Sequence, residues 1–209
     1  MSQTAQQVEN DVREALESGG DIYQRVRLIT LKALTERKLD LENIKSVVEA
    51  AFNGISTGIG DRTESAKANF AEAASAIDDV LEKTAQASKL AIEEATSRVS
   101  EFSQQDLNKA TADIESLEQI FLETLEKVAR NGNDMLFETA QNFITHARKN
   151  GTAVGRQTQT ILASLNDFRR QGQNAVLLGA TTTASIIAEI GSGILNGVAE
   201  SLESNRAKK

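Results

Sequence analysis

The chain contains no proline in 209 residues, although ordinary usage of about 5% would give roughly ten. Proline is excluded from helix interiors because it lacks a backbone N–H donor and clashes with the preceding turn. It is common, however, in loops and turns. A chain without proline therefore has few loops, and we expect helices joined by glycine or polar turns. The sequence predicts an all-α protein.

Composition excludes several classes of protein. The chain has no cysteine, which removes disulfides, thiolate metal sites and cysteine nucleophiles. A formal net charge of −7 disfavours nucleic-acid binding, because a protein that follows phosphates needs a basic surface. The first residues lack a basic region followed by an apolar run, so no secretory signal is expected. These observations favour a cytoplasmic protein of bacterial type.

Glycine takes the place of proline as the main helix breaker. We expect a single domain over 1–209. The positions of the helix breaks divide it into three parts. Short N-terminal helices are predicted over 1–60, a long helical hairpin over 61–131, and C-terminal helices over 133–209. The predicted fold is an elongated antiparallel bundle of about six to eight helices.

The longest predicted helix covers 61–103, where neither glycine nor proline interrupts the chain. Its apolar and small residues recur every 3.6 residues or so, the period of a straight helix, and its length would be roughly 60 Å. The second arm of the hairpin covers 105–131. When the two arms fold antiparallel, small residues of the first face large residues of the second. We therefore expect Ala95 to contact Ile114.

An apolar segment over 175–199 contains one charged residue, Glu189. It is long enough to enter or span a bilayer, but polar residues and four glycines dilute its hydrophobicity. Three interpretations remain open: a buried central helix, a surface that docks on lipid or another hydrophobic phase, and a membrane-spanning helix. The candidate surface-binding residues are Ile186, Ile187, Ile190 and Ile194.

Two pairs of glycines have the four-residue spacing that lets helix backbones approach closely. They are Gly54 with Gly58 and Gly193 with Gly197. Each glycine costs about 1 kcal/mol relative to alanine inside a helix, so several in one helix indicate a gain elsewhere. Helix packing is one interpretation, and simple helix ends or kinks are the other.

Basic residues collect in the C-terminal part of an otherwise acidic chain. They are Arg148, Lys149, Arg156, Arg169 and Arg170. One interpretation is attraction to an anionic lipid surface beside the apolar segment. The other, which we favour, is pairing with acidic faces of neighbouring helices within the same molecule.

No residue pattern indicates catalysis or a metal. A metal site in a helical bundle uses two Glu-x-x-His motifs, but His146 is the only histidine and Phe143 stands three residues before it. Adjacent acids such as Asp78 and Asp79 point in different directions on a helix, which indicates a solvated face. We expect no catalytic, cofactor or metal residues, and a protein that is not an enzyme.

Three stretches resemble a known family: Arg25–Leu34, Leu39–Glu42 and Phe121–Leu125. They are similar to an uncharacterised family of all-helical bacterial proteins, a domain of unknown function, over most of the chain. The resemblance implies no known activity or functional residue. In composition the chain is also similar to phasins, small cysteine-free helical proteins that coat polyester storage granules and expose amphipathic helices.

Two functions agree with these patterns. The first is a non-enzymatic amphipathic protein that associates with a hydrophobic or anionic-lipid surface, such as a storage granule or membrane, through 148–170 and 175–199. Helices of a bundle can open and exchange internal apolar contacts for contacts with such a surface. The second is a soluble scaffold or adaptor that binds a protein partner or self-associates. A helical pore-former, with 175–199 inserting, is a third variant.

Overall fold

The computed structural model describes residues 4–59, 64–97, 104–171 and 184–206, and every regular element in these ranges is an α-helix. The predicted all-α bundle is confirmed. The nine helices of these ranges are α1 (Ala5–Glu17), α2 (Ile22–Thr35), α3 (Leu41–Gly58), α4 (Glu64–Ser97), α5 (Gln104–Glu115), α6 (Leu117–Asn131), α7 (Asp134–Asn150), α8 (Ala153–Gln171) and α9 (Ala184–Arg206).

The number of helices exceeds the predicted range because the second arm of the hairpin is divided. Ser116 separates α5 from α6. Its hydroxyl donates to the carbonyl of Ala112 at 2.9 Å, and such side-chain bonds compete with the helical backbone pattern. The apolar spacing of 105–131 continues across this serine, so the sequence predicts one helix there.

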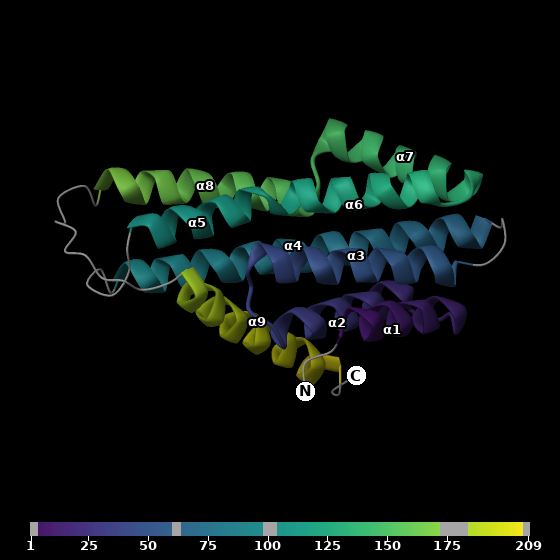
Figure 1. Cartoon of the computed structure of the whole chain (residues 1–209), viewed down its shortest axis with the longest axis horizontal. Coiled ribbons are helices and arrows are strands. Elements are labelled where there is room, and N and C mark those ends of the chain that lie inside the picture. Colours follow the sequence, from purple (N-terminus) through teal and green to yellow (C-terminus); the bar gives the residue numbers. More distant parts are fainter. Residues whose placement is uncertain (1–3, 60–63, 98–103, 172–183, 207–209) are drawn as a thin grey trace.

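The bundle is elongated and has α4 at its centre (Figure 1). In this view α3 and α4 form a middle layer, with α5, α6, α7 and α8 on one side and α1, α2 and α9 on the other. Helix α4 has 34 residues, which corresponds to about 51 Å. The remaining positions of the predicted long helix, 61–63 and 98–103, lie outside the described residues.

The hairpin of α4 with α5 and α6 runs antiparallel, as Figure 1 shows. Ala95 and Ile114 are both buried in the common core, and their direct contact stays a prediction. Helix α4 nevertheless packs more extensively against α2, α8 and α9 than against α5 and α6. Its many alanines therefore accommodate neighbours on several sides, whereas the sequence analysis considered one.

The N-terminal helices begin at polar capping residues. The Thr4 hydroxyl accepts a hydrogen bond from the backbone of Gln7, whose side chain accepts one from the Thr4 backbone N–H. Asp21 and Asp40 cap α2 and α3 in the same manner. The turn between α1 and α2 has φ of +67° at Gly19 and +88° at Gly20, which glycine adopts without a steric penalty.

Three phenylalanines connect the middle layer to the outer helices. The ring centroids of Phe52 in α3 and Phe121 in α6 are 5.7 Å apart, and those of Phe121 and Phe143 in α7 are 5.9 Å apart. Tilted and edge-on aromatic contacts of this kind contribute about 0.5–1.5 kcal/mol beyond area burial. This chain of rings fixes α7 against α6 on the outside of the bundle.

Candidate functional site

Helix α9 contains the part of the apolar segment that the structure describes. It covers Ala184–Arg206 rather than the predicted 175–199, and residues 175–183 lie outside the described residues. One face of α9, which we call the inner stripe, is buried and consists of Ile187, Gly191 and Leu195. The atoms nearest to a Cβ placed on Gly191 belong to Leu39, Ala91 and Ser88, so this stripe packs on α4 and on the residues just before α3.

A second row of apolar residues lies beside the first and reaches the surface. This outer stripe consists of Ile190, Ile194 and Val198, which are partly exposed; Ile190 and Ile194 also touch the core. The polar side of the helix carries Glu189, Asn196 and Glu200, all exposed. Helix α9 is therefore an amphipathic edge helix, and the prediction of a fully buried central helix is wrong for its described part.

The structure bears differently on the membrane-spanning and the surface-docking interpretations of this segment. Among the described residues, no helix is both long enough and apolar enough to cross a membrane. The side chain of Ile186 lies outside the described residues. The outer stripe is the part of the predicted docking surface that solvent reaches in the folded chain.

Polar contacts attach α9 to the connection between α2 and α3. The hydroxyl of Ser192 donates to the carbonyl oxygens of Arg37 at 2.7 Å and Thr35 at 3.1 Å. The backbone N–H of Leu39 donates to the carbonyl oxygen of Ala188 at 3.3 Å. Because the last carbonyls of a helix lack partners within it, Ser192 satisfies the C-terminal end of α2.

The two glycine pairs have different surroundings. Gly54 and Gly58 are buried where α1 crosses α3: a Cβ atom on Gly54 would overlap the carbonyl oxygen of Glu9, and one on Gly58 would lie 2.8 Å from the carbonyl oxygen of Arg13. Around Gly193 and Gly197 the described chain has no atom within 4 Å of such a Cβ. Among the described residues, therefore, no helix packs on the second pair, and both glycines lie on the exposed side of α9.

The predicted basic stretch is partly engaged inside the molecule. Arg148 forms a 2.5 Å ion pair with Glu126 of α6. Arg156 donates to the carbonyl oxygens of Gly151 at 2.7 Å and Asn150 at 3.2 Å, at the C-terminal end of α7. Lys149 is exposed. Intramolecular partners thus account for two of the three described basic side chains.

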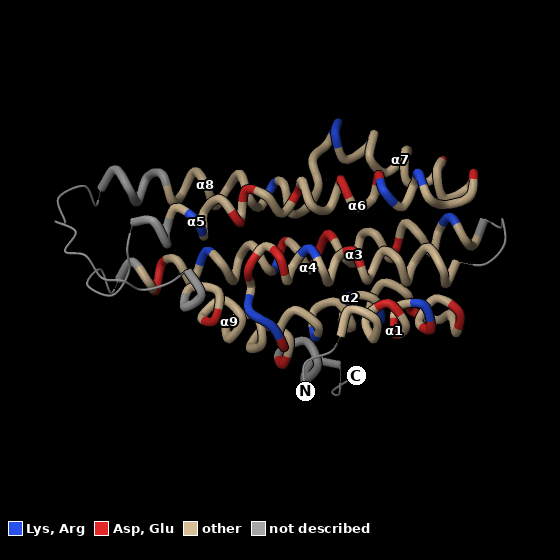
Figure 2. Tube along the Cα trace, in the orientation of Figure 1, with Lys and Arg blue, Asp and Glu red and all other residues tan. Residues whose placement is uncertain are grey.

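The side chains of Arg169 and Arg170 lie outside the described residues. Over the rest of the chain, Figure 2 shows basic and acidic residues interspersed along the helices rather than separated onto different faces. The described basic residues therefore do not gather on one helix or on one side of the bundle in this view.

Two acidic residues hold the start of α8. The carboxylate of Asp78 in α4 accepts from the backbone N–H groups of Ala153 at 2.7 Å and Val154 at 2.9 Å. Glu118 of α6 accepts from the Thr152 hydroxyl at 2.6 Å. Burial raises the pKa of Asp78, although its two backbone hydrogen bonds lower it. The anions also complement the positive end of the α8 dipole.

This arrangement corrects one prediction. Asp78 and Asp79 were assigned to a solvated face, but Asp78 is only 7% exposed, and Asp79 forms a largely buried ion pair with Arg27 of α2. The assignment failed because adjacent positions on a central helix point to two different neighbours, α8 and α2. Both carboxylates join helices together, and neither geometry indicates acid–base chemistry.

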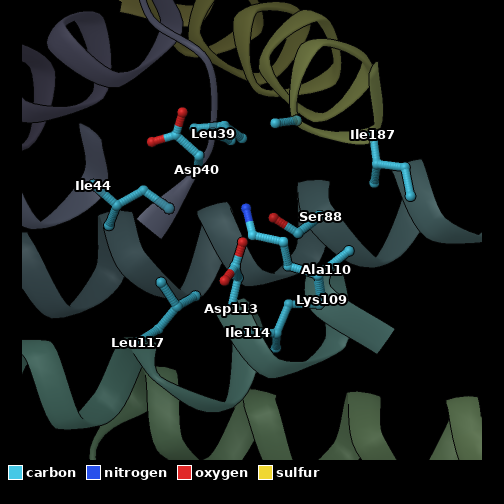
Figure 3. Close-up of a pocket in the computed structure, with 11 residues that line it drawn as sticks. Leu39, Asp40, Ile44, Ser88, Lys109, Ala110, Asp113, Ile114, Leu117 and Ile187 are labelled. Carbon is cyan, nitrogen blue, oxygen red and sulfur yellow. The ribbon is translucent and has the colours of Figure 1, made fainter. Parts of the chain in front are cut away.

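A cavity of about 130 Å³ lies beside α9, between α3, α4, α5 and the start of α6. Figure 3 shows its lining side chains. Most are apolar, and the polar ones are Asp40, Ser88, Lys109 and Asp113. Burial raises the pKa of Asp113; the Lys109 ammonium opposes this shift and the Asp40 carboxylate adds to it. No pattern in the sequence groups these four polar residues.

No metal centre is found in the part of the chain that the structure describes: no three His, Asp or Glu side chains there are arranged to hold an ion. His146 is exposed, and its ring nitrogen Nδ1 lies 3.0 Å from the side-chain nitrogen of Asn150. The single histidine thus contacts the last turn of its own helix, α7.

Comparison with known proteins identifies a family and no activity. A family of unknown function (DUF6781) matches residues 1–204. The chain belongs to this family. No curated protein and no solved structure matches it. The resemblance noted in the three stretches of the sequence therefore leads to the DUF6781 family, whose description assigns no function.

The cavity escaped the sequence analysis because its residues come from distant segments of this DUF6781 chain. Its walls include Leu39, Ser88 and Ile187, and only the packing of α9 brings them together. One local indication was available: Asp113 lies between Ala110 and Leu117, within the apolar spacing of the second hairpin arm. A carboxylate at that position faces either a partner or a polar cavity.

Proposed function

We propose that this protein is a non-enzymatic helical bundle that associates with an uncharged hydrophobic surface through α9. The observation that supports this is the outer stripe, in which Ile190, Ile194 and Val198 are partly exposed along two turns of an edge helix. Amphipathic helices with such a stripe lie in the plane of an apolar interface. The compositional similarity to phasins agrees with a surface of this kind.

The charge distribution favours an uncharged surface over an anionic one. Glu200 is exposed beside the outer stripe, and anionic lipid would repel it; Glu189, also exposed, forms a 2.7 Å ion pair with Lys38. Arg148 and Arg156 bond within the molecule, so recruiting them to lipid would cost these contacts. We therefore expect association that depends little on salt, because screening acts mainly on attraction between exposed charges.

The expected strength of binding to a hydrophobic surface indicates whether one copy of α9 would suffice. Burying the exposed part of three aliphatic side chains is worth about 2 kcal/mol, since complete burial of each is worth about 1.5–3 kcal/mol. Binding through the outer stripe alone is therefore weak. If α9 left the bundle, the inner stripe would add Ile187 and Leu195, but their contacts with α4 would be lost. Tight coating of a surface would require many copies of the protein acting together.

The experiment uses flotation of the full chain with neutral triglyceride droplets, neutral phosphatidylcholine vesicles and anionic phosphatidylglycerol vesicles. The test variant is Ile190→Gln/Ile194→Gln/Val198→Gln, which removes the outer stripe. The matched control is Asn196→Gln/Glu200→Gln, on the polar side of the same helix. We expect the parent and the control to float with the droplets at low and high salt, and the test variant to remain in solution.

Two results would contradict the proposal. One is the absence of droplet binding by the parent chain, and the other is equal binding by all three proteins. Binding to anionic vesicles alone, lost on addition of salt, would instead assign the interaction to exposed basic residues such as Lys149. Circular dichroism of each variant verifies that the helices remain folded.

The acidic border of the outer stripe supports a second candidate function. Glu189 and Glu200 next to exposed isoleucines would suit a protein partner that has an apolar centre and a basic rim, which is how protein interfaces are commonly arranged. In that case the chain is a scaffold or adaptor. Sedimentation analysis of the pure chain distinguishes one form of it, because self-association through the stripe would yield dimers that the triple glutamine variant does not form.

A further inference from the structure

The cavity beside α9 has the size and the lining of a small-molecule site. Its volume is about 130 Å³, and an apolar cavity of roughly 150 Å³ can hold a molecule the size of benzene. Aliphatic side chains from four helices form most of the wall, including Ile44, Leu117 and Ile187. Lys109 is exposed while it lines the cavity, so the cavity has access to solvent at that side.

The polar groups of the cavity carry an unbalanced charge. Two carboxylates, Asp40 and Asp113, accompany one ammonium group, that of Lys109. Asp40 is held in place, because its carboxylate accepts from the backbone N–H of Asn43 at 2.9 Å and from the Asn43 side chain at 3.0 Å. In Figure 3 the polar ends of Ser88, Lys109 and Asp113 are directed toward the same region of the cavity, and the carboxylate of Asp40 is turned away from it.

Burial and the neighbouring Asp40 both raise the pKa of Asp113, against the effect of Lys109. The negative charge on this carboxylate is therefore incompletely compensated in the folded chain. One additional positive charge in the cavity would balance the two carboxylates and the single ammonium.

We infer that this cavity binds a small primary amine that has an apolar body. The ammonium group of the ligand lies against the carboxylate of Asp113 and the hydroxyl of Ser88, where the nearby charge of Asp40 adds to the negative potential, and its hydrocarbon part occupies the space among the aliphatic side chains. Hydrogen bonds from an ammonium to a carboxylate are about twice as strong as bonds between neutral groups, so the charged end determines the selectivity.

Other ligand classes fit the site less well. An anion would face two carboxylates. An uncharged hydrocarbon would leave the carboxylates without compensation, and burial of unpaired charge is costly. A metal ion would need more ligands, since no three metal-binding side chains come together in the described part of the chain.

The test compares three probes of nearly equal size: n-butylammonium, n-butanol and butyrate. Binding to the full chain is followed by the movement of backbone amide signals in NMR spectra as each probe is added. So small a ligand has limited affinity, and we expect dissociation in the millimolar range for n-butylammonium. Binding of the alcohol should be at least about tenfold weaker, and butyrate should not bind. The signals that move should come from the segments that line the cavity: 39–44, 88, 109–117 and 187–188.

Two variants and a control locate the site. Asp113→Asn should weaken n-butylammonium binding about tenfold or more, whereas Glu115→Gln makes the same charge change at an exposed position of α5 outside the cavity and should have no effect. Ala110→Leu extends a lining side chain into the cavity and should abolish binding. Thermal melting of each variant verifies folding.

The inference would be overturned if n-butanol bound as well as n-butylammonium, or if Glu115→Gln weakened binding as much as Asp113→Asn. It would also be overturned if signals moved elsewhere in the chain. These measurements contain no droplet or vesicle, so they succeed or fail independently of the proposed association with a surface.

Discussion

Two glycine pairs with the same spacing have opposite surroundings in this bundle. At Gly54 and Gly58 the backbone of α1 lies directly on α3, and no side chain would fit between the helices. At Gly193 and Gly197 the described chain leaves open space. The four-residue spacing of the glycines thus indicates only that a close approach of two helix backbones is sterically allowed. Whether one occurs depends on which face of the helix is turned toward a neighbour.

The neighbouring residues explain the difference. Helix α1 presents Val8 and Val12 to α3, and both are fully buried. In α9 the buried face follows Ile187 and Leu195, and the glycine that continues this spacing is Gly191. Gly193 is two residues further on, which places it roughly 200° around the helix. Helix α1 is therefore attached by close backbone contact, and α9 by side chains and a few polar bonds.

The largest expected effect comes from filling the tight contact. Gly54→Ala would place a methyl group against the carbonyl oxygen of Glu9 and 2.9 Å from Cβ of Val12. Because backbone cannot swing aside as a long side chain can, we expect the free energy of unfolding to fall by about 2–3 kcal/mol, typical of overpacking. Urea denaturation measures the change. An unchanged midpoint would show that α1 is not held at this distance from α3.

A smaller effect is expected from the polar attachment of α9. Ser192→Ala removes the hydroxyl that donates to the carbonyl oxygens of Arg37 and Thr35, and the loss should be about 1 kcal/mol. Hydrogen exchange should then become faster in α9 and remain unchanged in α1 and α3. Equal acceleration in both regions would mean that the helices unfold together, which would remove the distinction between the two attachments.

The sequence predicted the parts of the fold that depend on one helix at a time. The lack of proline and the apolar period of α4 are local properties, and both agree with the structure. The neighbours of α4 could not be predicted equally well. Small alanine side chains lie on every side of α4. Their spacing therefore does not predict which side packs against α2, α8 or α9.

The candidate site depended even more on packing between distant segments. Asp78 is buried because the first residues of α8 pack on it. The residues near Asp78 in the sequence give no indication of this contact. The outer stripe was predictable as apolar spacing, but the extent of its exposure follows from how α9 is oriented on α4. Orientation of this kind is set by residues such as Gly191 and Ser192, which carry no strong local preference.

The open glycine pair yields an effect of opposite sign. A methyl group at Gly193 would meet no atom of the described chain within 4 Å, so Gly193→Ala should only improve helix propensity and raise the free energy of unfolding by roughly 0.5–1 kcal/mol. The matched comparison is Gly54→Ala, in which the same chemical change destabilises the protein. A loss of stability at Gly193 would reveal a contact that the described residues do not make, such as one with a second copy.

The smallest expected effect is a dependence of the unfolding free energy on pH. It arises in the cavity beside α9 and not at the α1–α3 contact. Burial raises the pKa of Asp113 above its usual value of 3.8, with Lys109 opposing and Asp40 reinforcing the shift. A carboxyl group with a raised pKa in the folded state favours folding while it is protonated, and this contribution disappears as pH rises through the raised value.

The difference in unfolding free energy between the parent chain and Asp113→Asn isolates this contribution, because all other carboxyl groups are common to both proteins. Relative to the variant, the parent should lose stability as pH increases from below 3.8 toward neutrality. Gly54→Ala, which changes no ionisable group, should show no such trend. If the parent instead gained stability over Asp113→Asn with rising pH, the ionised carboxylate would have to be compensated in the folded chain, and the cavity would not need a cation to balance its charge.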